Sequence, residues 1–173
     1  PENRPVPLAL FSQVEQAEKM VTEAIQLGGE ILSGEAAKGA NDPPRFPPTL
    51  VIHAKPEMTI CREASFAPIG AVLPFSDLTE GCSTWNTSPF QLTASIFTND
   101  PKKVKVWAER LPVSTLVVND VIVPTAHPAI AFGGRKMAGW GVTRGKDGLL
   151  AMTTPQAILT RTGKFRPHYD GTD

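Results

Sequence analysis

The order of apolar runs and capped helical segments restricts the fold of this chain more than any other feature. Apolar runs occur at residues 49–53, 69–75, 93–98 and 115–119. Segments with helical spacing or helix-start signals separate most of them. Because parallel strands need a crossover between them, usually a helix, this alternation predicts parallel βαβ units. We therefore expect an α/β fold with three layers, in which helices flank a parallel sheet.

Three helix starts are marked by capping residues. Ser12 with Glu15, and Asp77 with Glu80, have the spacing of a capping box, in which each side chain satisfies a backbone N–H at the helix start. Asp100–Pro101 supplies the favoured pair for the N-cap and the first helical position. These signals predict helices that begin near residues 12, 77 and 100.

Charge and cysteine usage exclude several classes of protein. The chain has 173 residues, with 17 basic and 17 acidic side chains, so no net charge draws it to nucleic acid or an anionic membrane. No apolar run is long enough to span a bilayer. The two cysteines and three scattered histidines have no metal-ligand spacing. We expect no metal site, and a reducing, cytoplasmic location.

The loop at residues 58–69 holds two candidate ligand-binding side chains. It places the acid Glu63 and the aromatic Phe66 just before a predicted strand, where α/β folds carry ligands. Taken alone, Glu63 is better explained as a solvated loop charge. Cys61 has no His in its motif, and Cys82 falls on the apolar side of a predicted helix. We therefore expect neither cysteine to be a nucleophile.

The most conspicuous motif is the glycine-bearing loop at residues 132–145. A phosphate cradle formed by Gly139, Gly141 and Gly145 is one interpretation, but their spacing is not that of a dinucleotide fingerprint. The favoured interpretation is a shaped loop that needs positive φ and close backbone approach.

Six segments, in this order, resemble motifs of the aldehyde dehydrogenase family. They are Phe46–Thr49, Met58–Ile69, Asn86–Thr98, Asn119, Phe132–Gly139 and Gly148–Leu149. The resemblance implies that residues 1–156 are the C-terminal part of the family's catalytic domain. It also implies an oligomerisation strand at 157–161, within a C-terminal segment of residues 157–173 that ends in a polar tail. The start at Pro1, without a Met, indicates a trimmed chain.

The resemblance implies NAD(P)-dependent oxidation of an aldehyde to an acid. In the family the nucleophilic Cys, the general base, the oxyanion Asn and the Rossmann domain precede the matched segment, so we expect no catalytic residue here and no activity from the chain alone. Glu63 and Phe66 would contact NAD or NADP, Phe132 would line the aldehyde pocket, and the last strand would join another copy in a homo-oligomer. The alternative is a non-catalytic module that holds oligomers together.

Four positions depart from the family's pattern. Ala64 replaces the acid that holds the nicotinamide ribose, and Ala67, Gln91 and Ala138 replace Gly, Gly and Ser. The Ala64 side chain has no hydrogen-bond acceptor, so we expect the ribose to be held less firmly.

Overall fold

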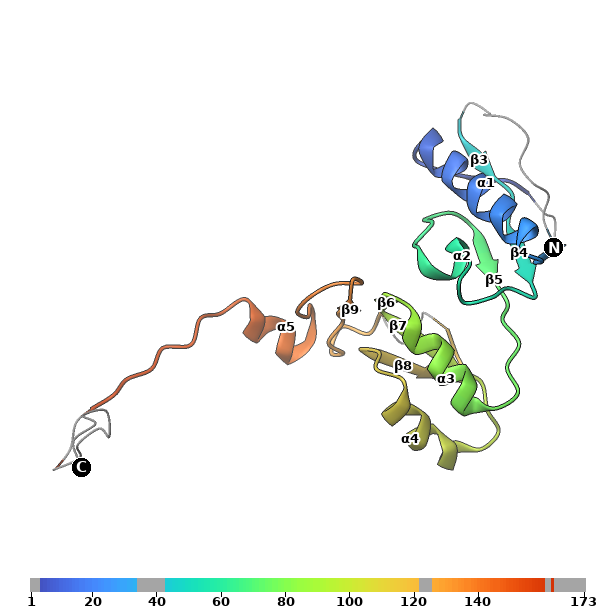
Figure 1. The fold of residues 1–173 in the computed structure, drawn as a ribbon. Coiled ribbons are helices and arrows are strands. Elements are labelled where there is room, and N and C mark those ends of the chain that lie inside the picture. The colour runs from blue at the N-terminus through green and yellow to red at the C-terminus, as the bar shows by residue number, and fades with distance from the viewer. Residues whose placement is uncertain (1–3, 34–42, 122–125, 161–162, 164–173) are drawn as a thin grey trace, which may run out of the picture.

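Helices and short strands alternate along the chain, in a computed structural model that describes residues 4–33, 43–121, 126–160 and 163. Within these ranges the elements are β1 (Val6–Pro7), α1 (Phe11–Gln26), β2 (Glu30–Ser33), β3 (Arg45–Phe46), β4 (Thr49–Ile52), α2 (Thr59–Arg62), β5 (Ile69–Ala71), α3 (Leu78–Thr87), β6 (Phe90–Gln91), β7 (Thr93–Ile96), α4 (Pro101–Arg110), β8 (Thr115–Val118), β9 (Arg135–Lys136) and α5 (Gly145–Ala151). Elements β1 to β5 form one group with α1 and α2, and β6 to β9 form a second group with α3 and α4 (Figure 1).

Helix α1 packs an apolar stripe into the first group. Val14, Ala17 and Val21 are buried in a cluster with Phe46 of β3, and Ala24 joins a second cluster with Val51 of β4. The spacing of three and four residues keeps this stripe on one side of the helix, while the other side faces water. Neither α1 nor any other helix in the described part is long and apolar enough to cross a bilayer.

The strand pairs confirm the α/β class, with sheets that are mixed rather than wholly parallel. β4 pairs in parallel with β5 and β7 with β8, and the crossover between the strands contains α2 or α4. β2 pairs antiparallel with β4, as do β1 with β3 and β6 with β9. An antiparallel neighbour needs no crossover helix, and no described helix lies between β2 and β4.

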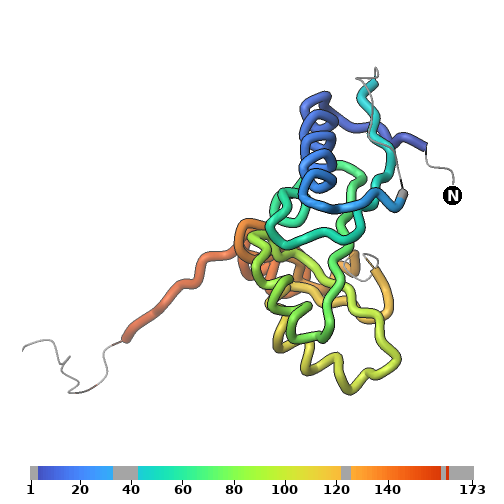
Figure 2. Tube along the Cα trace, turned by 45° about the vertical axis from the view of Figure 1, so that its right-hand side comes forward, coloured from blue at the N-terminus to red at the C-terminus, as the bar shows by residue number. Residues whose placement is uncertain are grey.

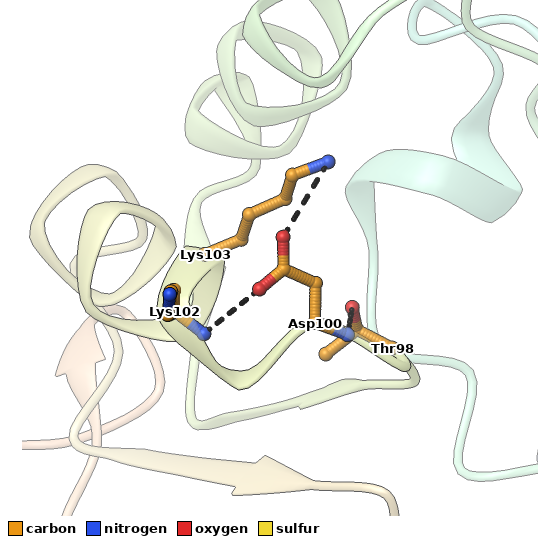
Figure 3. Close-up of polar contacts among 4 residues, drawn as sticks. All are labelled: Thr98, Asp100, Lys102 and Lys103. Carbon is orange, nitrogen blue, oxygen red and sulfur yellow. Dashed lines mark hydrogen bonds and ion pairs between the residues drawn. The ribbon is translucent and has the colours of Figure 1, made fainter.

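The predicted starts of α3 and α4 are confirmed by their caps. Asp77 Oδ1 accepts hydrogen bonds from two backbone N–H groups of α3, at 2.7 and 3.0 Å. Asp100 Oδ1 accepts from the Lys102 N–H at 3.0 Å, while the Asp100 N–H donates to Thr98 Oγ1 at 3.0 Å (Figure 3). The Lys103 ammonium lies 3.9 Å from Asp100 Oδ2. Each cap satisfies donors that have no partner inside the helix.

The predicted start of α1 is wrong by two residues. The N-cap is Leu10, so Ser12 lies inside the first turn. Gln13 takes over the capping role, because its Oε1 accepts hydrogen bonds from the N–H groups of Ala9 and Leu10, each at 3.1 Å. A polar side chain in the first turn therefore satisfies the backbone donors at and just before the helix start.

Residues 157–160 of the predicted strand at 157–161 form no strand within this single chain. Residues 154–160 have no regular secondary structure and extend away from the two groups (Figure 2). Ile158 and Leu159 are 84% and 91% exposed. A strand is stable only when a neighbour pairs with it, and none of the described strands does so. Residues 161–162 and the tail at 164–173 lie outside the described part, and pairing with another copy stays a prediction.

Glycines set the shape of the loop that contains β9. Across this loop, Phe132 N–H donates to the Thr143 carbonyl at 2.8 Å, and Thr143 N–H donates to the Phe132 carbonyl at 2.7 Å. A Cβ on Gly134 would lie 2.1 Å from the Ala138 carbonyl oxygen. Positive φ occurs at Gly139, Gly141 and Gly145. The interpretation of the loop as one that needs positive φ and close backbone approach is confirmed.

The carboxylate of Glu23 joins α1 to α2. It accepts hydrogen bonds from the Thr59 N–H and the Thr59 hydroxyl, both at 2.8 Å. Since Thr59 is the first residue of α2, we expect Glu23→Ala to lower the free energy of unfolding by about 1–2 kcal/mol. Urea denaturation followed by circular dichroism measures this change. The matched control is Glu15→Ala, an exposed position on the same helix, and an equal loss in both variants would contradict the assignment.

Two glycine variants separate steric from conformational demands in the loop. Gly134→Ala should lower the free energy of loop opening by roughly 3 kcal/mol, because its methyl group would overlap a backbone carbonyl. Gly141→Ala should lower it by only about 1–2 kcal/mol, because φ is +64° there but the added Cβ has nothing within 4 Å. Hydrogen exchange at the Phe132 and Thr143 amides reports this opening. The reverse order of effects would be inconsistent with this structure.

Candidate functional site

The loop between α2 and β5 presents an aromatic side chain to solvent. Phe66 is 81% exposed and has φ of +49°, a conformation that few residues other than glycine adopt. A short turn fixes the next residue, since Ser65 Oγ accepts a hydrogen bond from the Ala67 N–H at 3.3 Å. The backbone therefore holds the ring outward, where it can contact a ligand.

Glu63 lies at the other end of this loop, where α2 ends. Its N–H donates to the Thr59 carbonyl at 2.9 Å, which fixes the backbone, and its side chain is exposed. Within the described ranges no group hydrogen-bonds to its carboxylate or pairs with it. An exposed aromatic ring and a carboxylate with open acceptor sites suit a flat ligand that carries hydroxyl groups. The side chains of Glu63 and Phe66 are of the types that suit a nicotinamide cofactor, whereas Ala64 has no hydrogen-bond acceptor.

Phe132 is held by the bridge at the base of the glycine loop. The ring is half-buried, and the Arg144 guanidinium carbon lies 4.7 Å from its centroid. This distance is within the range of a cation–π contact. Phe132 and Arg144 are brought together because Thr143, the residue before Arg144, is the bridge partner of Phe132. Their separation in sequence gave no signal of this contact.

Lys136 attaches the glycine loop to the end of α3. Its Nζ donates to the Asn86 carbonyl at 2.7 Å and to the Ser88 carbonyl at 2.9 Å. The last carbonyls of a helix have no partner inside it, and a lysine ammonium there is favourable. The role of this lysine could not be predicted from its local motif, because its partners lie about fifty residues away in the chain.

A cavity of about 680 Å³ lies between the two groups of elements. Its lining includes the aromatic residues Phe75, Trp85 and Phe90, together with Cys61. Glu63, Phe66 and Phe132 are not among the lining residues, so the structure does not gather the predicted site residues around this cavity.

The Cys61 thiol has an environment that opposes its ionisation. Burial raises its pKa, and the nearby carboxylates of Glu57 and Glu23 raise it further. A nucleophilic cysteine needs a thiolate, which these surroundings disfavour. Cys82 is buried in α3, where it acts as a small core residue.

Comparison with known proteins identifies relatives in one family. The 4,4'-diapolycopene aldehyde oxidase of Methylomonas sp is 36% identical over 108 residues, which are 62% of this chain and 20% of that protein. The succinate semialdehyde dehydrogenase [NAD(P)+] Sad of Escherichia coli (strain K12) is 33% identical over 141 residues, which are 81% of this chain and 30% of that protein. The 3-sulfolactaldehyde dehydrogenase of Priestia aryabhattai is 29% identical over 153 residues, 88% and 31% of the two chains.

The fold agrees with these relatives. The crystal structure of lactaldehyde dehydrogenase from Escherichia coli is similar with a TM-score of 0.80 and 26% identity, over 88% of this chain and 31% of that chain. The chain thus spans less than a third of the length of the relatives it matches. A model of the aldehyde dehydrogenase family matches residues 2–158, nearly the whole sequence, and the chain therefore belongs to the aldehyde dehydrogenase family.

Proposed function

We propose that the chain is one wall of the active site of an NAD(P)-dependent aldehyde dehydrogenase, which oxidises an aldehyde to an acid. The observation that carries this proposal is the loop of Glu63 and Phe66, in which a backbone turn holds an aromatic ring 81% exposed within a family motif. When bound, the cofactor accepts a hydride from the substrate. Phe66 contacts its nicotinamide ring, and Glu63 accepts hydrogen bonds from its hydroxyl groups.

Phe132 lines the aldehyde pocket in this proposal. The backbone bridge to Thr143 and the attachment of Lys136 to α3 hold its ring in place without using the ring itself. The ring therefore stays available to exclude water from the aldehyde and to position it. Neither cysteine of this chain supplies the nucleophile, because Cys82 is buried and the pKa of Cys61 is raised.

We further propose a cytoplasmic homo-oligomer in which residues 157–161 pair with another copy. The exposed side chains of Ile158 and Leu159 support this pairing, because a second chain would remove them from water. A second candidate function is a non-catalytic module that holds oligomers together. Ala64 favours this second function, because a protein that binds no cofactor does not need an acid at this position to hold the ribose.

Three of the relatives named above act on aldehydes of two kinds. Succinate semialdehyde and 3-sulfolactaldehyde carry an acid group that is ionised at neutral pH, whereas the diapolycopene aldehyde is an apolar polyene. An ionised acid group is best accommodated by a cation beside the aldehyde pocket, and a polyene by an apolar channel.

The 173-residue chain by itself should not reduce NAD or NADP in the presence of any aldehyde. Positioning a cofactor and an aldehyde against one wall forms no covalent intermediate without an activated thiolate. The absorbance of the reduced cofactor, followed with short, branched and aromatic aldehydes, measures this. Turnover that disappears in Cys61→Ser would make Cys61 the nucleophile and overturn the prediction.

In the complete enzyme of this proposal, Ala64→Glu should tighten binding of the oxidised cofactor roughly tenfold. The new carboxylate would accept hydrogen bonds from the ribose, and a bond to a charged group contributes about 1.5 kcal/mol or more. Titration calorimetry measures the affinity. Ala64→Gln, which restores an acceptor without the charge, should give a smaller gain. If neither variant changes the affinity, the ribose is held by other residues.

A further inference from the structure

The position of the Arg144 guanidinium over Phe132 depends on backbone hydrogen bonds as well as on the contact between the two side chains. Phe132 and Thr143 exchange two backbone hydrogen bonds, at 2.7 and 2.8 Å, and Arg144 follows directly. Its guanidinium carbon then lies 4.7 Å from the centre of the Phe132 ring. A guanidinium placed on an aromatic face loses rotational freedom before any ligand arrives.

The Arg144 guanidinium has no anionic partner among the residues that the structure describes. The ion pair described for this chain joins Lys103 to Asp100, and no described carbonyl accepts a hydrogen bond from Arg144. Two other arginines do donate, Arg110 to the Thr79 hydroxyl and Arg45 to a backbone carbonyl. Arg144 is also half-buried, so water satisfies its donors less completely than at a fully exposed position.

The guanidinium carbon of Arg144 lies over the Phe132 ring, and the N–H donors of a guanidinium lie in the plane of the group. These donors match the two oxygens of a carboxylate or the oxygens of a sulfonate, and such charge-assisted pairs are stronger than neutral hydrogen bonds. An anion that meets these donors would lie next to the Phe132 ring. An aldehyde that packs against this ring and ends in an anionic group would satisfy both side chains.

We propose that Arg144 is a specificity-determining residue, which selects aldehydes that carry a carboxylate or sulfonate at the end away from the carbonyl. This inference rests on the proposed function, in which Phe132 lines the aldehyde pocket. Two of the relatives named above, those for succinate semialdehyde and 3-sulfolactaldehyde, act on aldehydes of this class. A third relative acts on an apolar polyene aldehyde, and a preference for apolar aldehydes would be the opposite outcome of the test.

Steady-state kinetics of the complete enzyme with succinate semialdehyde and with pentanal, a neutral aldehyde of similar length, tests the proposal. In Arg144→Gln, kcat/KM for succinate semialdehyde should fall roughly tenfold or more, while kcat/KM for pentanal stays within about twofold. The loss should appear in KM, because a contact far from the carbonyl acts equally on the bound substrate and the transition state. Arg144→Lys should retain part of the preference.

Arg135→Gln is the matched control, because it removes the same charge from an exposed position in the same loop. It should leave the ratio of the two kcat/KM values unchanged. Equal losses for both aldehydes in Arg144→Gln would mean that Arg144 only supports the fold, and would overturn the proposal. A wild-type preference for pentanal would overturn it as well.

A binding measurement separates this inference from the proposed function. The 173-residue chain is titrated with propionate and with neutral propionamide, and the Arg144 Nε–H resonance is followed by NMR. We expect a saturable shift of this resonance with propionate and no shift with propionamide. If the complete protein oxidises no aldehyde but the shift is present, the proposed function fails and the anion site stands. If aldehydes are oxidised but propionate causes no shift, the anion site fails and the proposed function stands.

Discussion

Burial of the apolar stripe of α1 is the interaction on which the first group of elements depends. Ala17 and Ala24 are fully buried, and their small side chains let the helix backbone approach β3 and β4 closely. The opposite side of α1 carries Glu23, whose carboxylate fixes the first turn of α2 through Thr59. Since α2 ends at the loop of Glu63 and Phe66, the placement of the candidate cofactor contacts depends on the packing of α1.

The second group positions its candidate site residue by polar rather than apolar contacts. Its helices α3 and α4 bury little, with Cys82 the buried residue of α3. Lys136 instead connects the glycine loop to the carbonyls that end α3, and the backbone bridge at Phe132 closes the loop. Hydrogen bonds of this kind are directional, so they define the orientation of a loop more sharply than apolar packing does.

Features that depend on neighbouring residues could be predicted from the sequence, and features that depend on distant ones could not. The caps at Asp77 and Asp100 need only residues within one helical turn, and both are present. The cap at Ser12 is absent because the helix begins two residues earlier, where Gln13 Oε1 accepts hydrogen bonds from the N–H groups of Ala9 and Leu10. The strand at 157–161 required a partner strand, which local sequence cannot provide.

In the candidate site, too, local motifs could be predicted from the sequence and contacts between distant residues could not. Glu63, Phe66 and Phe132 were found because they lie in motifs that resemble those of a family, and the family match is confirmed. The contacts of Arg144 and Lys136 were not predicted, although Lys136 lies in the matched segment Phe132–Gly139, because only the folded loop reveals what they contact.

Side chains that are exposed or have no described hydrogen-bond partner are the candidates for ligand binding. Side chains whose polar groups are hydrogen-bonded within the chain support the fold. Phe66 is exposed next to a short turn, and the Glu63 carboxylate, at the other end of the same loop, has no described partner. Lys136, by contrast, donates hydrogen bonds from its ammonium to two backbone carbonyls. Its side chain therefore stabilises the loop. We propose that Arg144 combines both roles, since its guanidinium carbon lies over the Phe132 ring while its N–H donors have no described acceptor. A residue of this kind can stabilise a pocket and select its ligand with the same side chain, because stacking uses the π-face and anion binding uses the edge.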